Sequence, residues 1–259
     1  MFQEIVDCKS FDQHCEEKKI KWFPIKKRNL INSKIFVGLY QKKESFLQKK
    51  IQMANADFDV IAQNTIVDSM YSPEYTVLKE LSINKYVSQK QLEHNLPSLP
   101  VLTSFMSLEK QRPQMNIIFP FVPRTLHEYV KDKFHHFIKH QHNLAKQIIL
   151  HFCLLEKLHV HHNDFHHHNI MIKTEKIPRI LRLTHEGSTY TMLTNGMIVF
   201  LIDYGLAVVD PTRSNFAELY HFFQHCPEFK TLFPLVRNCK NFSDLLKNFF
   251  KEKKIFLFK

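Results

Sequence analysis

Residues whose types and spacing could carry chemistry gather in two short segments. Residues 161–169 read His-His-Asn-Asp-Phe-His-His-His-Asn, and residues 201–205 read Leu-Ile-Asp-Tyr-Gly. An Asp followed five positions later by an Asn, and then by a second Asp before an aromatic residue and a Gly, is typical of phosphoryl-transfer sites. Asp164 would orient an acceptor hydroxyl, while Asn169 and Asp203 would offer the oxygen ligands that Mg²⁺ prefers. The alternative is that both aspartates are ordinary loop carboxylates that cap helices or turns.

Phosphoryl transfer also needs positive charge near the phosphates. A strand, a polar turn and a second strand are expected over residues 34–51, and Lys49 occupies the last position of a Val-Ala-Ile-Lys-like strand. Glu74, near the start of a helical pattern, is the best candidate to hold this lysine. The alternative is a solvated lysine pair (Lys49 and Lys50) on a hairpin edge, and a helix-start glutamate favoured by the helix dipole. A Gly-rich phosphate loop is missing, because residues 27–33 contain no Gly.

The elements that must position these residues follow from the hydrophobic periodicity. A β-rich first half with one main helix precedes a mostly helical second half that carries the loops. A Glu-Gly pair at 186–187 predicts the turn of a hairpin. The expected strands are 34–40, 45–51, 101–106, 116–121, 170–172, 179–183, 189–193 and 197–202, and the expected helices are 58–86, 125–132, 144–158 and the segment from 216 onwards.

The composition limits the class of protein. A chain of 259 residues, 44% of them apolar, can bury the core of one sizeable domain or of two small lobes. Its net charge of +11 favours anionic partners, although lysines that merely cover the surface would give the same number. The five cysteines include no Cys-x-x-Cys pair, so a reducing compartment fits best and neither a disulfide framework nor a zinc ribbon is expected. No segment approaches the roughly 20 apolar residues that span a bilayer, and no signal peptide is expected.

Six histidines lie between positions 159 and 168, which raises the question of a metal site. Their spacing fits no His-Glu-x-x-His helix, and they fall on a predicted loop, so a structural or catalytic zinc is not expected there. We expect His162 to pack in the core and brace the loop, and His167 and His168 to be solvated.

At these segments the chain resembles the eukaryotic-type protein kinases. The tripeptide 162–164, His-Asn-Asp, stands where the family has His-Arg-Asp, and 203–205, Asp-Tyr-Gly, stands where it has Asp-Phe-Gly. The chain is most similar to the haspin-like atypical branch, whose catalytic loop reads Asp-Leu-His-Trp-Gly-Asn; here residues 164–169 read Asp-Phe-His-His-His-Asn. His166 therefore falls where most kinases have a Lys and haspin-like kinases have a His. A hairpin insertion before an Ile-Asp-Tyr element is also haspin-like.

The resemblance implies an α+β, two-lobed protein-kinase-like fold. Its small β-rich N-lobe would carry one main helix, and its C-lobe would be mostly helical. Residues 1–28 would form an N-terminal extension that packs on the lobes, and 29–122 the N-lobe and hinge. Residues 123–259 would form the C-lobe, with the β-hairpin insertion at 174–197.

The resemblance also implies an activity and a set of site residues. The activity is that of an ATP-dependent Ser/Thr protein kinase, which uses ATP and Mg²⁺ to phosphorylate a protein hydroxyl. Asn163 replaces the family's Arg and no Ala-Pro-Glu motif follows Asp203, so activation by loop phosphorylation is not expected. Glu218 is the only acid in the helix that should anchor the catalytic loop. The implied site residues are Asp164 and His166 for catalysis, Asn169 and Asp203 for the metal, Lys49 and Glu74 for the phosphates, and Phe119 and Phe121 in the hinge beside the adenine.

The expected partner is a protein with a Ser or Thr acceptor, including chromatin-associated proteins by family analogy, with no direct nucleic-acid readout and no membrane association. We expect a monomer inside the host cell, in the cytoplasm or nucleus or packaged in a virion, because the small size and reduced motifs resemble divergent kinases of large DNA viruses. One alternative is a pseudokinase that acts as a binding module, which the missing Gly-rich loop favours. The other is a small-molecule kinase of the aminoglycoside or choline type, since those enzymes share the same Asp and Asn pattern.

Overall fold

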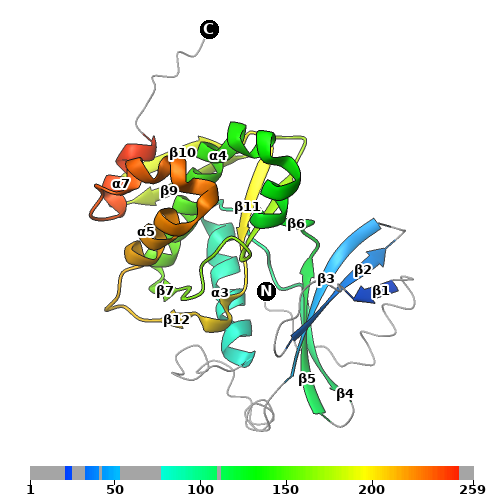
Figure 1. Ribbon diagram of the computed structural model, residues 1–259. Coiled ribbons are helices and arrows are strands. Elements are labelled where there is room, and N and C mark those ends of the chain that lie inside the picture. Colours follow the sequence, from blue (N-terminus) through cyan, green and yellow to red (C-terminus); the bar gives the residue numbers. More distant parts are fainter. Residues whose placement is uncertain (1–20, 25–32, 41–42, 53–76, 110–111, 251–259) are drawn as a thin grey trace. The chain divides into compact units, whose positions relative to one another are not determined.

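The structure is a computed structural model that describes residues 21–24, 33–40, 43–52, 77–109 and 112–250 (Figure 1). The fold is mixed α+β, as expected. The chain divides into two compact units. Unit 1 comprises residues 1–89, 99–122 and 203–206, and unit 2 comprises residues 90–98, 123–202 and 207–259. No helix in the described part of the chain is both long enough and apolar enough to cross a membrane.

Unit 1 is built on a five-stranded antiparallel sheet in the order β1-β2-β3-β5-β4. The hairpin expected over residues 34–51 is confirmed: β2 and β3 pair along their length, with an irregularity in register between Gly38 and Leu39. In the interior strand β5, the side chains of Met115, Ile117 and Ile118 are buried, which accounts for the nearly continuous apolar run of this strand. The strands are β1 (Lys21–Pro24), β2 (Ser33–Tyr40), β3 (Lys43–Gln52), β4 (Thr103–Glu109) and β5 (Arg112–Pro120).

The helix of unit 1 is α3 (Val77–Glu93), whose last turn belongs to unit 2. Its buried side chains recur at helical spacing, and they include the polar residues Glu80, Asn84 and Ser88 beside the apolar residues Leu81 and Val87. The helix runs seven residues further than the expected end at 86, and its expected beginning at 58–76 lies outside the described residues.

Unit 2 is organised around α4 (Leu126–Lys157). The helix begins with a capping box, in which the Thr125 hydroxyl accepts from the Glu128 N–H and the Glu128 carboxylate accepts from the Thr125 N–H. Lys133 has non-helical backbone angles and marks a kink. The prediction of two helices, 125–132 and 144–158, was therefore wrong about the segment between them. Helical residues continue directly after the kink and bury Phe137 and Gln141.

Short sheets surround this helix in unit 2. Three antiparallel strands follow the order β11-β8-β6, a hairpin pairs β9 with β10, and β12 pairs with β7. The hairpin turns at Glu186 and Gly187, both with positive φ, as the predicted two-residue turn requires. The strands are β6 (Arg124–Thr125), β7 (Val160–His161), β8 (Ile170–Thr174), β9 (Ile180–His185), β10 (Ser188–Leu193), β11 (Met197–Leu201) and β12 (Val208–Val209).

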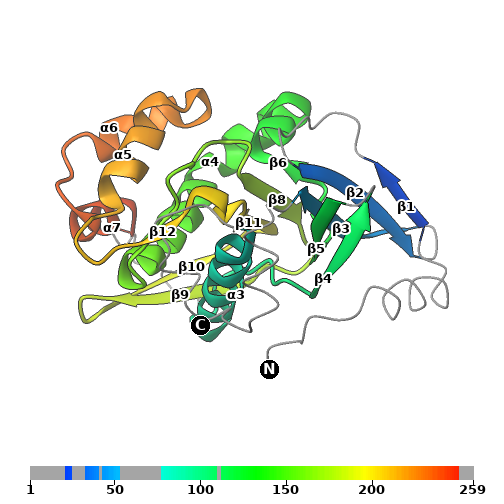
Figure 2. The same cartoon turned by 90° about the horizontal axis from the view of Figure 1, so that it is seen from below.

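The C-terminal segments pack beside α4, where Figure 2 shows α5, α6 and α7 grouped together. Their core is aromatic: Phe137 of α4, Phe222, Phe223 and Phe229 are buried and their rings meet edge to face or tilted. The helical prediction from 216 onwards is confirmed as several short elements. They are α5 (Phe216–His225), η3 (Pro227–Leu232), α6 (Phe233–Val236) and α7 (Phe242–Phe250), and the short helix η2 (Tyr204–Leu206) belongs to unit 1.

Candidate active site

Lys49 lies in the interior of the unit 1 sheet. Its strand β3 pairs with β2 on one side and with β5 on the other, and Lys49 stands opposite Ile35 and Ile117. Only 13% of its side-chain surface is exposed. The alternative of a solvated lysine on a hairpin edge is therefore wrong for Lys49.

The Lys49 ammonium group is held between two carboxylates. Its Nζ lies 2.6 Å from Oε1 of Glu80 and 2.9 Å from Oδ1 of Asp203. Glu80 is 1% exposed and Asp203 29% exposed. Burial by itself lowers the pKa of Lys49, but the charges of Glu80 and Asp203 and the hydrogen bonds to both outweigh it and raise the pKa above its usual value. The lysine is therefore charged at every physiological pH.

Glu80, in the first turn of α3, is the carboxylate that pairs with Lys49. Glu74, the partner expected from the sequence, lies outside the described residues. The sequence signal that could have found Glu80 is its place in the helix. It is an acid on the same buried stripe as Leu81, Asn84 and Val87, where an acid is rarely left without a partner.

Asp203 begins the short segment of unit 1 that follows β11. Its φ of +64° lies in the left-handed region, which Asp tolerates better than most side chains. The next side chain, Tyr204, is 2% exposed and anchors the segment. Lys49 and Asp203 lie 154 positions apart in the chain; the sequence placed both near a phosphate site but did not predict their contact.

The second group of expected residues lies in unit 2, in the loop between β7 and β8. The Asn169 amide donates to the Asp164 backbone carbonyl over 2.9 Å and to Asp164 Oδ2 over 3.3 Å. Because the amide nitrogen of Asn169 is used in these bonds, its side-chain oxygen Oδ1 is the atom that could bind a metal ion. His166 Nε2 lies 3.6 Å from Asp164 Oδ1. Asn169 is buried, whereas the side chains of Asp164 and His166 are 41% and 46% exposed, so solvent can reach both.

Bonds to the backbone hold this loop from both ends. Nε2 of His162 and the carbonyl oxygen of Ile202 are 2.9 Å apart, and the Ile202 N–H donates to the Asn169 carbonyl over 3.0 Å. His162 is fully buried, which confirms its expected bracing role. Asp203 is the next residue in the chain after Ile202.

Glu218 of α5 anchors the middle of the loop. Its carboxylate accepts the N–H of Phe165 over 3.3 Å and also takes hydrogen bonds from the backbone of His162 and Asn163. Burial raises the pKa of Glu218 above its usual value, and these bonds offset part of the rise. The Phe165 ring packs on Phe222 of the same helix, with ring centroids 4.5 Å apart. Glu218, the only acid of this helix, therefore holds the loop through its backbone.

The structure therefore places the expected residues in two groups. Lys49 and Asp203 meet in unit 1, joined by Glu80, and Asp164, His166 and Asn169 meet in unit 2. The two expected hinge residues belong to unit 1. Phe119 lies in β5 opposite Leu47, Phe121 follows that strand, and both are partly exposed.

The donor atoms suit the cofactors that the sequence led us to expect. Asp203 offers a carboxylate and Asn169 an amide oxygen, which are ligands for a hard divalent cation such as Mg²⁺. Lys49, Glu80 and Asp203 together carry one positive and two negative charges, a balance that favours a further cation. Comparison with models of known protein families gives no match, and no curated protein matches the chain.

Proposed function

We propose that the protein is an ATP-dependent Ser/Thr protein kinase of the haspin-like type. The observation that carries the proposal is the ion group of Lys49, Glu80 and Asp203. Burying a lysine with a glutamate is weak evidence for stability, because apolar residues of similar size stabilise a core at least as well. The same three residue types, taken from a sheet strand, a helix and an Asp-aromatic-Gly segment, are what nucleotide phosphates and their metal ion require.

Each residue has a distinct role in this reaction. Lys49 binds the phosphates, and Glu80 keeps its ammonium group in position. Asp203 and Asn169 would offer oxygen ligands to Mg²⁺, which would supply positive charge for the phosphates. Asp164 accepts a hydrogen bond from the acceptor hydroxyl and orients it towards the γ-phosphoryl group. Binding through Lys49 and orientation through Asp164 are both needed, so substitution in either unit should stop transfer.

A kinase assay tests the proposal directly. Purified full-length protein is incubated with labelled ATP, Mg²⁺ and mixed histones, beside the variants Asp164→Asn and Asp203→Asn. We expect transfer by the wild type and a loss of about 10²-fold or more in each variant, the usual consequence of removing a group that acts on the transferring phosphate. A wild type that binds nucleotide but phosphorylates no protein would refute the kinase and favour a binding module. Transfer to aminoglycosides or choline instead of protein would favour the small-molecule alternative.

A matched pair of glutamates on α3 isolates the ion group. Glu80→Gln removes the charge that faces Lys49, whereas Glu93→Gln removes an exposed charge that pairs with Lys90. We expect Glu80→Gln to lower kcat/KM for ATP by about 10-fold or more, and Glu93→Gln to leave it unchanged. Equal kinetics in the two variants would contradict the role given to Glu80.

A further inference from the structure

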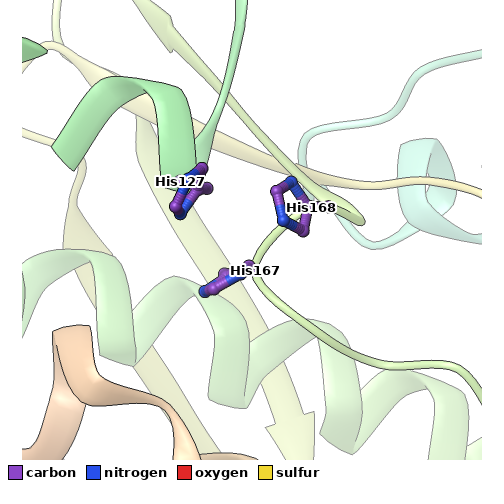
Figure 3. Close-up of side chains that lie close together, drawn as sticks. All are labelled: His127, His167 and His168. Carbon is purple, nitrogen blue, oxygen red and sulfur yellow. The ribbon is translucent and has the colours of Figure 1, made fainter. Parts of the chain in front are cut away.

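Three histidine rings from two distant segments of unit 2 lie together (Figure 3). His127 comes from the first turn of α4, and His167 and His168 come from the loop before β8. The ring centroids are 4.7 Å apart for His127 and His167, 4.7 Å for His127 and His168, and 4.4 Å for His167 and His168. One nitrogen of each ring lies within 4.8 Å of the others.

A carboxylate lies beside two of these three histidines. Glu228 of η3 is 9% exposed, and its Oε1 lies 3.1 Å from Nδ1 of His167 and 3.8 Å from Nδ1 of His127. The Cys226 thiol donates to the other oxygen, Oε2, over 3.0 Å, which fixes the carboxylate in place. A carboxylate bonded to one ring nitrogen leaves the second nitrogen to a metal ion and orients the ring, as in known metal sites.

We propose that His127, His167 and His168 bind one divalent transition-metal ion of the zinc class. Three imidazole nitrogens with an open fourth position form an established ligand set for Zn²⁺. Imidazole is a poor ligand for Mg²⁺, which takes oxygen atoms, so this site differs in chemistry from the oxygen ligands proposed for Mg²⁺. The expectation of no zinc here rested on the spacing of the loop histidines alone, without His127.

The geometry requires only a small closure of the rings. Bonds of about 2.0–2.1 Å in a tetrahedral arrangement place nitrogen atoms roughly 3.3 Å apart. The three nitrogens must therefore approach by at most about 1.5 Å from the 4.8 Å limit. His168 is exposed and 45% of the His127 side chain is accessible, so rotation about their side-chain bonds can supply this movement.

A bound ion would tie the loop to α4. His167 and His168 lie between Asp164 and Asn169 in sequence, so the ion would restrain the segment that carries the proposed catalytic groups. The three histidines need no nucleotide to bind the ion, so metal binding can be measured independently of kinase activity.

Metal titration tests the site. Full-length protein without an affinity tag is stripped with a chelator, and Zn²⁺ is then titrated in competition with a chromogenic chelator, without nucleotide. We expect one tight site in the wild type, weakened more than about 100-fold in His127→Ala and about 10- to 100-fold in Glu228→Gln, the range found for outer carboxylates. Co²⁺ in place of Zn²⁺ should give the visible absorption of a low-symmetry site.

The chain offers a demanding control in α5. His221 and His225 are exposed and stand one helical turn apart, with ring centroids 4.3 Å apart, so they can chelate a metal ion weakly. His221→Ala should leave the tight site intact. Equal affinity in the wild type and His127→Ala, or loss of the tight site in His221→Ala, would overturn the proposal. Loss in Cys226→Ser but not in His127→Ala would also overturn it, because it would assign the ion to His167, Cys226 and Glu228, which also lie close enough to share one.

Discussion

Lowering the pH should destabilise the protein through one buried histidine. His151 of α4 is fully buried; its Nδ1 lies 3.2 Å from the Gln91 amide nitrogen and its Nε2 lies 3.2 Å from the carbonyl oxygen of Val199. Burial lowers its pKa from 6.5 to about 4, against a smaller rise from the bond to Val199. The unfolded chain therefore takes up this proton at a higher pH than the folded protein does. The stabilising contribution is complete above pH ~6.5 and is lost as the pH falls towards 4.

The magnitude follows from the difference in pKa. A shift of roughly 2.5 pH units, at about 1.4 kcal/mol each, is worth about 3 kcal/mol in full, of which about 2 kcal/mol is already lost at pH 5. Urea denaturation at pH 7.5, 6 and 5 measures the loss in the wild type and in His151→Gln, which cannot take up the proton. The free energy of unfolding of the wild type should fall more steeply, by about 2 kcal/mol between pH 7.5 and 5.

Other titrating groups change both proteins equally, so the difference between the two slopes isolates His151. The variant His221→Gln, which removes an exposed histidine of α5 outside the proposed metal site, serves as the control and should keep the slope of the wild type. Parallel pH dependence in the wild type and His151→Gln would refute the assignment of a buried, neutral imidazole.

Three further outcomes can be checked. Gln147→Leu should lower the free energy of unfolding by about 2–4 kcal/mol in urea, because the buried amide both donates to and accepts from the backbone of β11; Gln224→Leu, on an exposed position of α5, should change it little. Gly196→Ala should cost about 1–3 kcal/mol more than Gly187→Ala in thermal unfolding. Both glycines have positive φ, but only a Cβ at Gly196 would come within 2.8 Å of a backbone carbonyl. Glu218→Ala should reduce phosphoryl transfer about 10-fold or more while the protein remains folded by circular dichroism, since it releases the loop and not the core; unchanged transfer would contradict the anchoring role.

The sequence predicted the elements whose formation depends on neighbouring residues, such as the two hairpins. The β2–β3 hairpin and the β9–β10 hairpin each combine alternating side chains with a short polar turn, and both form where expected. The middle of α4 was missed for a physical reason. Between the kink at Lys133 and Leu144 the helix exposes Phe134 and Ile138 and carries many histidines, so its apolar stripe is interrupted in sequence although its backbone is helical.

Contacts within one motif could be predicted from sequence spacing. Contacts between distant segments were missed, because they depend on tertiary packing. Asp164 and Asn169 belong to one loop, and the structure brings them into contact as expected. The partner of Lys49 could not be chosen from sequence alone, because several acids precede or occupy α3 and only packing selects Glu80. The approach of His127 to His167 likewise depends on how the loop lies against α4, 40 positions apart in the chain.

The scarcity of glycine in this chain has a consequence for mutagenesis. Six non-glycine residues adopt positive φ within the described segments, among them Asn163 and Asp203, and only two described glycines do so. Asp203 thus serves as both a carboxylate and a backbone bend, two tasks that many proteins give to separate residues. An alanine at this position would remove the carboxylate that pairs with Lys49 and also disfavour the bend, so any effect on activity would have two causes. Asparagine retains the bend, and the comparison of Asp203→Asn with Asp203→Ala therefore separates ligand chemistry from chain conformation.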